Sequence, residues 1–508
     1  MYKFELTNVE SIKMKKLFVI PVVCFLLAMS AFAQEINLVF ADFDKFFYDE
    51  TMRIDYFHIG NSTEELITLD QVYKYGIWAG SRKYLVDDLN LGRYCAKIYD
   101  AATNQLIFSK GFDSYFGEYK TSTEGLNGIK RTFQESVLIP YPKNKIIFSL
   151  ERRDEKQNLF EFFRTEIDPA DVMIIRDEVK NKQVKVYDAE SNGDPHDRVD
   201  IVILGEGYTV DEKSKFEKDL KHFSDVFFSQ EPYKSYADKF NIHGVYKPSE
   251  DSGIDEPRAG IFKNTVLSCT FNSMGSERYV LTEDNKAVRD LAANVPYDAI
   301  YIMINHSRYG GGGIYNLFCT FTTDNQFKDY LFLHEFGHSF SGLADEYYTS
   351  DVQYNDFYPV KLEPLEPNIT ALLDPANLKW KEYLAPGIEI PTPWNKAAFD
   401  SMDYKWQAER RTMNNKIAEL KKNKSDIELI QTAENEYAKK DKKHSDLVDS
   451  YLKKNKDYGK VGAFEGAGYV STGMYRPMLD CIMFSKGSKP YCIVCNAHIA
   501  KVIERYTE

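Results

Sequence analysis

Residues 331–340 are the segment whose residue types most clearly indicate catalytic chemistry, because they contain His334, Glu335 and His338. On an α-helix, residues four apart lie on the same face, so the two imidazoles can bind one metal ion. Glu335 projects beside them and can take a proton from a water molecule at that ion, as in zinc-dependent peptidases. The pattern therefore predicts one catalytic Zn²⁺, with His334 and His338 as ligands and Glu335 as the general base. The alternative is an ordinary buried helix that carries two histidines.

A third ligand is expected after this helix, because catalytic zinc usually has three protein ligands and one open position. Gly342 can end the helix and turn the chain. Asp345 follows the turn, so its carboxylate can return to the metal and is the predicted third ligand. Glu346 is the alternative ligand, and the two acids could instead form only local caps or ion pairs.

A second candidate element lies far downstream, in residues 466–483, where glycines, tyrosines and a proline indicate a loop. Tyr475 could donate a hydrogen bond to the oxyanion of a peptidase transition state, although a surface tyrosine fits the sequence equally well. Met483 resembles the methionine that underlies the zinc site in metzincin-type peptidases. Met474 and Met478 are alternatives, and so is an ordinary core methionine.

Four consecutive glycines, within residues 307–313, follow a predicted buried strand. The absence of side chains lets another backbone approach closely. This favours a strand edge that binds an extended peptide substrate. A flexible loop is the alternative.

The elements that must position these residues indicate an α/β catalytic domain from 196 to 508. Residues 199–204 and 299–304 are apolar runs typical of buried strands, and residues 209–228 have a helical period with phenylalanines on one face. The segment 396–458 contains no glycine or proline and is rich in charged residues. We interpret it as a helical hairpin inserted in the catalytic domain, which could alter substrate access; a disordered charged linker is the alternative.

The region ahead of the catalytic domain, residues 35–170, is predicted to be β-rich. Short runs such as 94–99 and 145–150 are separated by polar turns, a spacing typical of a small β-sandwich. Residues 170–195 then form a polar connector. The expected fold class is therefore mixed α and β in several domains.

The N-terminus predicts export. Lys15 and Lys16 precede an apolar run, 17–29, and a small-residue cleavage site ends at Ala33. Residues 1–33 therefore match a signal peptide, and the mature chain is expected to be secreted or periplasmic. A membrane anchor is the alternative, but a span needs about 20 apolar residues.

The net charge bears on which classes of partner the chain binds, and the cysteines bear on disulfide formation. The net charge of −13 does not favour nucleic acid or anionic membranes as partners. No later segment is apolar enough to span a membrane. Six of the seven cysteines follow the signal segment, and two among Cys481, Cys492 and Cys495 are expected to pair in an exported chain.

Together these residues resemble the IgA peptidase family of secreted bacterial zinc metallopeptidases. The catalytic likeness lies in residues 200–208, 249–257, 334–347, 391–393, 464–469, 475–477 and 492–495, and the N-terminal likeness in 52–58 and 78–81. The resemblance implies a metzincin-like peptidase domain behind a β-sandwich, with His334, His338 and Asp345 as ligands and Glu335 as base. It implies a protein or peptide substrate, including host proteins and glycoproteins, without identifying it.

The expected function is thus hydrolysis of peptide bonds by a secreted zinc endopeptidase. One alternative is a binding or adhesion protein that uses the β-sandwich and carries a vestigial peptidase domain. The intact His-Glu-x-x-His motif argues against it, since a decayed site usually loses Glu335 or a ligand. The other alternative is a zinc hydrolase that acts on a non-peptide, glycan-linked bond.

Overall fold

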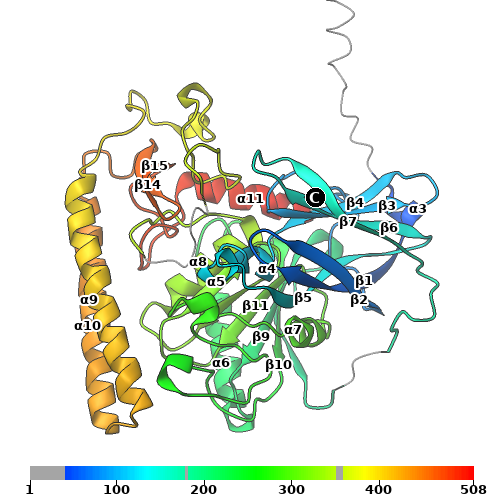
Figure 1. The fold of residues 1–508 in the computed structure, drawn as a ribbon, viewed down its shortest axis with the longest axis horizontal. Helices are drawn as coiled ribbons and strands as arrows, with labels where there is room; N and C mark the ends of the chain where they lie inside the picture. Colours follow the sequence, from blue (N-terminus) through cyan, green and yellow to red (C-terminus); the bar gives the residue numbers. More distant parts are fainter. Residues whose placement is uncertain (1–40, 178–180, 351–357, 508) are drawn as a thin grey trace, which may run out of the picture. The chain divides into compact units, whose positions relative to one another are not determined.

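The computed structural model describes residues 41–177, 181–350 and 358–507. The predicted signal segment, 1–33, lies outside the described residues. Within them, no helix is both long and apolar enough to cross a membrane. The secondary structure is mixed α and β, as expected (Figure 1).

The first part of the chain forms two antiparallel sheets that share one hydrophobic core. The strands of the first are β1 (Phe47–Gly60), β2 (Glu65–Tyr75) and β5 (Arg131–Pro142), and those of the second are β3 (Tyr94–Asp100), β4 (Leu106–Phe112), β6 (Ile146–Arg153) and β7 (Leu159–Ile167). Ile54 of β1, Ile98 of β3 and Phe148 of β6 are fully buried in that core. The β-rich prediction for this region is confirmed, and the predicted strands 94–99 and 145–150 correspond to β3 and β6.

The second part is built on a six-stranded sheet in the order β12-β13-β11-β9-β10-β8. The strands are β8 (Lys185–Glu190), β9 (Val199–Glu206), β10 (Phe240–Tyr246), β11 (Ala299–Ile304), β12 (Gly311–Ile314) and β13 (Phe318–Thr322). The four inner strands are parallel, and the two edge strands are antiparallel to their neighbours. The predicted buried strands are β9 and β11. The prediction of a connector through 170–195 was wrong for β8, whose largely solvent-facing side chains give an edge strand a polar sequence.

Helices α6 (Lys213–Phe227), α8 (Lys328–Ser341) and α11 (Ile493–Thr507) contribute to the main core of this domain. The phenylalanine face predicted for 209–228 is buried on α6. A separate cluster joins the domain to the N-terminal sheets, where Tyr115 and Phe133 pack with Val202 and Leu204 of β9. That contact brings the N-terminal sheets close to the six-stranded sheet, against which α8 packs.

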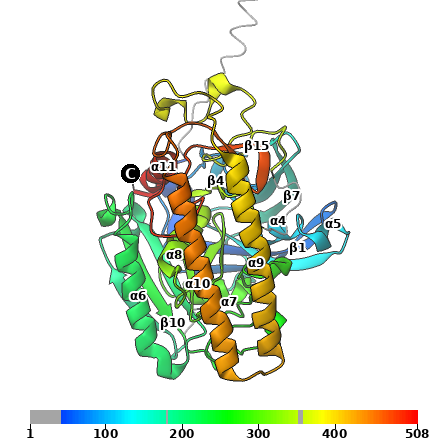
Figure 2. The same cartoon turned by 90° about the vertical axis from the view of Figure 1, so that its left-hand side faces the viewer.

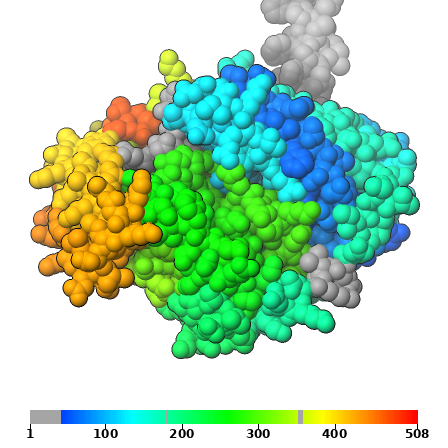
Figure 3. All heavy atoms as spheres, turned by 60° about the horizontal axis from the view of Figure 1, so that its bottom comes forward, coloured from blue at the N-terminus to red at the C-terminus, as the bar shows by residue number. Residues whose placement is uncertain are grey.

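The charged segment forms two long helices, α9 (Lys396–Lys422) and α10 (Ile427–Leu452), which lie side by side (Figure 2). We call this pair the helical hairpin. Its surface lies directly against the domain built on the six-stranded sheet (Figure 3). Arg410 Nη1 lies 2.6 Å from Glu277 Oε1, and Lys421 Nζ lies 3.1 Å from Glu256 Oε1. The prediction of long helices rather than a linker is confirmed.

Candidate active site

Helix α8 is the element that presents the His-Glu-x-x-His residues. It is almost entirely buried and packs against β12 and β13. The close approach predicted for the glycine run occurs here: a Cβ atom on Gly313 would come within 2.4 Å of the Glu335 carbonyl oxygen. Three of the four glycines lie in the edge strand β12 (Gly311–Ile314), and Gly313 has no room for a side chain because the helix backbone lies so near.

The end of α8 brings the chain back toward its own histidines. Gly342 has a φ of 61° and ends the helix as predicted, and the Leu343 N–H donates to the Gly337 carbonyl at 3.1 Å. The turn places the Leu343 carbonyl 2.6 Å from Nδ1 of His338. The residues that follow, Asp345 among them, then run past the side of α8 that carries the two histidines.

The two imidazoles are oriented by backbone carbonyls. His334 Nδ1 lies 3.0 Å from the Ile482 carbonyl oxygen, and His338 Nδ1 is bonded to that of Leu343. These contacts assign the ring proton to Nδ1 in each case, so each Nε2 carries a lone pair. The two Nε2 atoms lie 3.2 Å apart.

Asp345 completes a group of three convergent atoms. Its Oδ1 lies 3.0 Å from His334 Nε2 and 3.2 Å from His338 Nε2, and it is buried without a hydrogen bond. Three atoms with lone pairs at this spacing repel one another unless a cation lies between them. Ligands of a tetrahedral zinc ion with bonds of about 2.0–2.1 Å are about 3.3 Å apart, so the donor set fits zinc.

The anionic carboxylate of Asp345 favours a positive charge beside it, which either a protonated histidine or a metal ion supplies. Burial alone would raise the pKa of Asp345, but the two histidines outweigh it and hold that pKa well below its usual range. Burial would lower the pKa of His338, yet Asp345 raises it to about 9. Burial raises the pKa of Glu335, against the opposing effect of the histidines. A carboxyl group with a raised pKa is suited to accept and return a proton near neutral pH.

A hairpin supports the second oxygen of Asp345. Strands β14 (Phe464–Ala467) and β15 (Val470–Arg476) form it, within a stretch expected to be a loop. The loop prediction was wrong there because glycines with positive φ, such as Gly468, supply the tight turn that the strands need. At that turn the Tyr469 hydroxyl donates to Asp345 Oδ2.

The methionine candidates lie in different places. A Cβ atom on Gly337 of α8 would meet the sulfur of Met483 at 2.9 Å, so Met483 lies directly beneath the helix between the two histidines. Met474 is buried in a separate small cluster. Met478 packs at the margin of the main core.

The remaining predicted site residues are not brought to this point. Tyr475 lies in β15, where its backbone is paired with Thr370, and it does not line the cavity above the histidines. Glu346 is fully buried, and its carboxylate lies beside Cys495 and Asn368.

The cavity contains residues that the sequence did not single out for a role. Arg278 Nη2 donates to the Tyr347 hydroxyl at 3.1 Å, and the Tyr347 ring stacks parallel to that of His334. The N-terminal part of the chain also contributes to its wall, through Arg93, Asp113 and Glu118, which lie in loops and a short helix beside the sheets. Tyr347 follows Asp345 by two residues, which is a weak local signal. The N-terminal residues give none, because only the tertiary fold brings them to α8.

A second cavity adjoins the first. Arg278, Tyr309, Tyr330 and Tyr347 line both of them, and Asp403, Trp406, Arg410 and His444 of the helical hairpin line the second. The hairpin therefore forms one side of the space that leads away from the histidines.

Two family profiles match the chain. The family described as IgA Peptidase M64 matches residues 188–503, and the one described as Peptidase M64 N-terminus matches residues 42–164. A comparison with curated proteins gave no match.

Proposed function

Because the chain belongs to the IgA peptidase M64 family of metallopeptidases, we propose that it is an exported, zinc-dependent endopeptidase. The observation that carries this proposal is the convergence of His334 Nε2, His338 Nε2 and Asp345 Oδ1 in a buried cavity. We assign these three atoms as the zinc ligands. Glu346, the alternative third ligand, is directed at the cysteines instead.

A bound zinc ion would lower the pKa of a water molecule at its open position and polarise the carbonyl of the scissile bond. Glu335 supplies the proton transfer. Its carboxylate offers an oxygen within 4.8 Å of a nitrogen of each ligand histidine. It takes the proton of the attacking water and returns it to the leaving amine.

We propose Tyr347 as a donor to the oxyanion of the transition state. Its ring faces that of His334, and Arg278 orients its hydroxyl. Burial raises the pKa of Tyr347 well above its usual range, so the hydroxyl keeps its proton at neutral pH. The oxyanion role predicted for Tyr475 stays a separate prediction, without a contact to the cavity that supports it.

The substrate is a protein or peptide, as membership of a peptidase family implies. We propose that an extended segment of it adds beside the Gly313 end of β12, the edge strand that lines the cavity, since the backbone of Gly311 is already bonded to Arg278 and Val280. Arg93, Asp113 and Glu118 from the N-terminal part of the chain would contact one end of the segment, and the helical hairpin the other.

Several finer assignments belong to the same proposal. The two N-terminal sheets would form the β-sandwich of residues 35–170, and residues 196–508 the catalytic domain with the hairpin at 396–458. The position of Met483 under α8 supports a metzincin-like site. Cleavage near Ala33 would release the mature enzyme as a secreted or periplasmic protein.

The test uses a partly unfolded protein such as reduced casein, with a glycopeptide in parallel. We expect wild-type protein to generate new peptide N-termini, detected by mass spectrometry. A chelator should abolish cleavage and zinc should restore it, whereas His334→Ala should stay inactive with zinc. Release of glycan without new N-termini would favour the glycan-linked hydrolase. Binding of substrate without any cleavage, by zinc-loaded protein, would favour the adhesion protein.

A further inference from the structure

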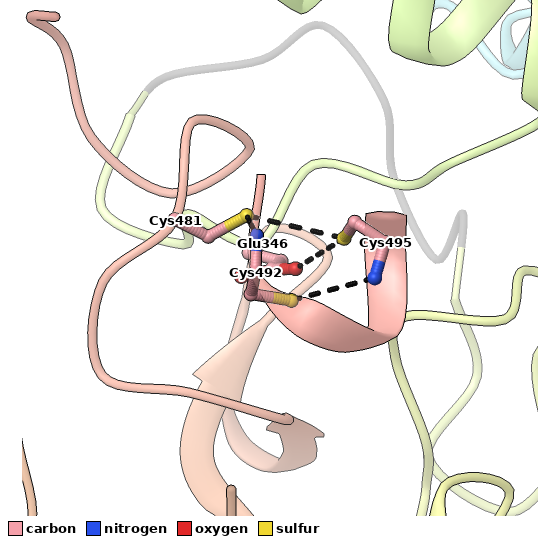
Figure 4. A group of neighbouring side chains, drawn as sticks. All are labelled: Glu346, Cys481, Cys492 and Cys495. Atoms are coloured by element: carbon pink, nitrogen blue, oxygen red, sulfur yellow. Dashed lines mark hydrogen bonds between the residues drawn. The ribbon is translucent and has the colours of Figure 1, made fainter. Parts of the chain in front are cut away.

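A second group of metal-ligating side chains lies behind the active site. It consists of Glu346, Cys481, Cys492 and Cys495, all buried, whose ligand atoms lie within 4.8 Å of one another (Figure 4). Cys492 immediately precedes α11 and Cys495 lies in its first turn, while Cys481 comes from the loop after β15. Glu346 comes from the segment after α8, so three parts of the chain meet here.

The spacing of these atoms fits a tetrahedral zinc ion. Zinc bonds of about 2.3 Å to sulfur place two sulfurs about 3.8 Å apart, and a sulfur and an oxygen about 3.6 Å apart. The sulfurs of Cys481 and Cys495 are 3.9 Å apart, and Cys495 Sγ lies 3.3 Å from Glu346 Oε1. A disulfide needs about 2.0 Å between its sulfurs, and all six cysteines among the described residues are free thiols.

The hydrogen bonds around this group leave one carboxylate oxygen without a donor, which favours a bound cation. Glu346 Oε2 is buried without a hydrogen-bond partner, while Oε1 accepts from Asn368 Nδ2 at 3.1 Å. A buried carboxylate with one oxygen unsatisfied is costly, and a metal ion bound through Oε1, the oxygen beside Cys495, would offset its charge. Backbone N–H groups point at two of the sulfurs: that of Cys492 lies 3.2 Å from Cys481 Sγ, and that of Cys495 lies 3.5 Å from Cys492 Sγ.

These N–H groups are the donors that a thiolate requires, and they orient the sulfurs as outer-shell contacts do in metal sites. A fully buried guanidinium, that of Arg476, also interacts electrostatically with Glu346. It offsets part of the negative charge that three thiolates and a carboxylate would keep after binding a divalent ion.

We propose that Glu346, Cys481, Cys492 and Cys495 bind a second Zn²⁺, which is structural. Thiolate-rich sets favour zinc over magnesium or calcium. Four protein ligands leave no open position, and burial excludes solvent, so this ion has no part in hydrolysis. The site stands whether or not the proposed peptidase activity is correct, because it rests on different ligands.

The second ion would hold in place the loop that supports the active site. The Glu346 N–H donates to the Met483 carbonyl at 2.8 Å, and the Phe484 N–H donates to the Cys481 carbonyl at 2.9 Å. Between them, the Ile482 carbonyl accepts from His334. Cross-linking Cys481, Glu346 and α11 through one ion therefore fixes the carbonyl that orients a catalytic ligand.

The experiment is metal analysis by mass spectrometry of protein purified without added chelator. We expect about two zinc ions per wild-type chain, about one in Cys492→Ser, about one in His334→Ala and none in the double variant. Glu346→Gln, which keeps the shape of the side chain, should also lose the second ion. Cys95→Ser is the matched control, because Cys95 is a buried thiol in β3 of the N-terminal sheets, and it should keep both ions.

Cobalt substitution of the wild-type protein tests the ligands without any mutation. Thiolate-bound Co²⁺ gives a strong sulfur-to-metal charge-transfer absorption, which a site of two histidines and a carboxylate does not. We expect this absorption in wild type and in His334→Ala. Its absence, with at most one zinc in wild type, would overturn the proposal. So would a wild-type chain lighter by two hydrogens with a disulfide among the three cysteines. Loss of peptidase activity with two ions present would contradict only the proposed function.

Discussion

Replacing Tyr469 with phenylalanine should weaken zinc binding without removing a ligand. The substitution deletes only the hydroxyl that donates to Asp345 Oδ2 and keeps the ring, which packs 5.6 Å from that of Tyr347. The Tyr469 N–H remains bonded to the Tyr347 carbonyl at 3.0 Å, so the turn itself is retained. The carboxylate then loses the contact that fixes its second oxygen.

The magnitude follows from the kind of hydrogen bond that is lost. A bond to a charged group contributes about 1.5–3 kcal/mol. Loss of an outer-shell partner typically lowers metal affinity about 10–100-fold, which corresponds to about 1.4–2.7 kcal/mol. We therefore expect the dissociation constant for zinc to rise by that factor, with kcat/KM largely recovered at saturating zinc.

The assay is competition for zinc against a chelator of known affinity, followed by peptide hydrolysis across a zinc titration. Tyr475→Phe, on the same hairpin, is the informative companion. If Tyr475 donates a hydrogen bond to the oxyanion, Tyr475→Phe should lower kcat and leave the zinc affinity unchanged. If Tyr475 lies outside the site, both kcat and the zinc affinity should stay near the wild-type values. Unchanged zinc affinity in Tyr469→Phe would refute the assignment of Asp345 as a ligand held by this hydroxyl.

Three other changes test separate parts of the account. Gly313→Ala should lower thermal stability by about 1–3 kcal/mol, because its Cβ would meet the Glu335 carbonyl at 2.4 Å; an unchanged melting temperature would contradict the close packing. Burial would raise the pKa of Glu256, but His306 and Lys421 hold it well below its usual range. The contribution of ionised Glu256 to the free energy of unfolding is therefore fully present above about pH 4.3, near the pKa of an unfolded glutamate. It is lost as the pH falls toward the pKa of Glu256 in the folded protein. Glu256→Gln should destabilise the protein more at about pH 7 than at about pH 3 in calorimetry, and an equal loss at both would exclude this ion pair. Tyr347→Phe should lower kcat about 10²–10³-fold at full zinc occupancy if it is an oxyanion donor, and an unchanged kcat would remove it from the mechanism.

The sequence predicted the parts of the site that depend on local spacing. The four-residue interval between His334 and His338 requires only a helix, and Gly342 marks where that helix ends. The glycine run was correctly associated with a close backbone approach, although the sequence could not show that α8 is the backbone concerned.

Other parts depend on contacts between distant segments and have no periodic signal. Tyr469 meets Asp345 only because the β14–β15 hairpin folds over the turn after α8. Arg93 reaches the cavity only through the packing of the N-terminal sheets. The cysteines were expected to pair with one another, because in an exported chain cysteine spacing indicates disulfides, and the approach of Glu346 is visible only in three dimensions.

The most direct test of the central claim is a side-by-side measurement of zinc content and peptide hydrolysis for wild type and Glu335→Gln. The substitution keeps the size of the side chain and leaves the three proposed ligands in place. We expect equal zinc in the two proteins and a loss of about 10²–10⁴-fold in kcat for the variant. Full activity in Glu335→Gln at equal zinc content would contradict the proposed general base and, with it, the proposed mechanism.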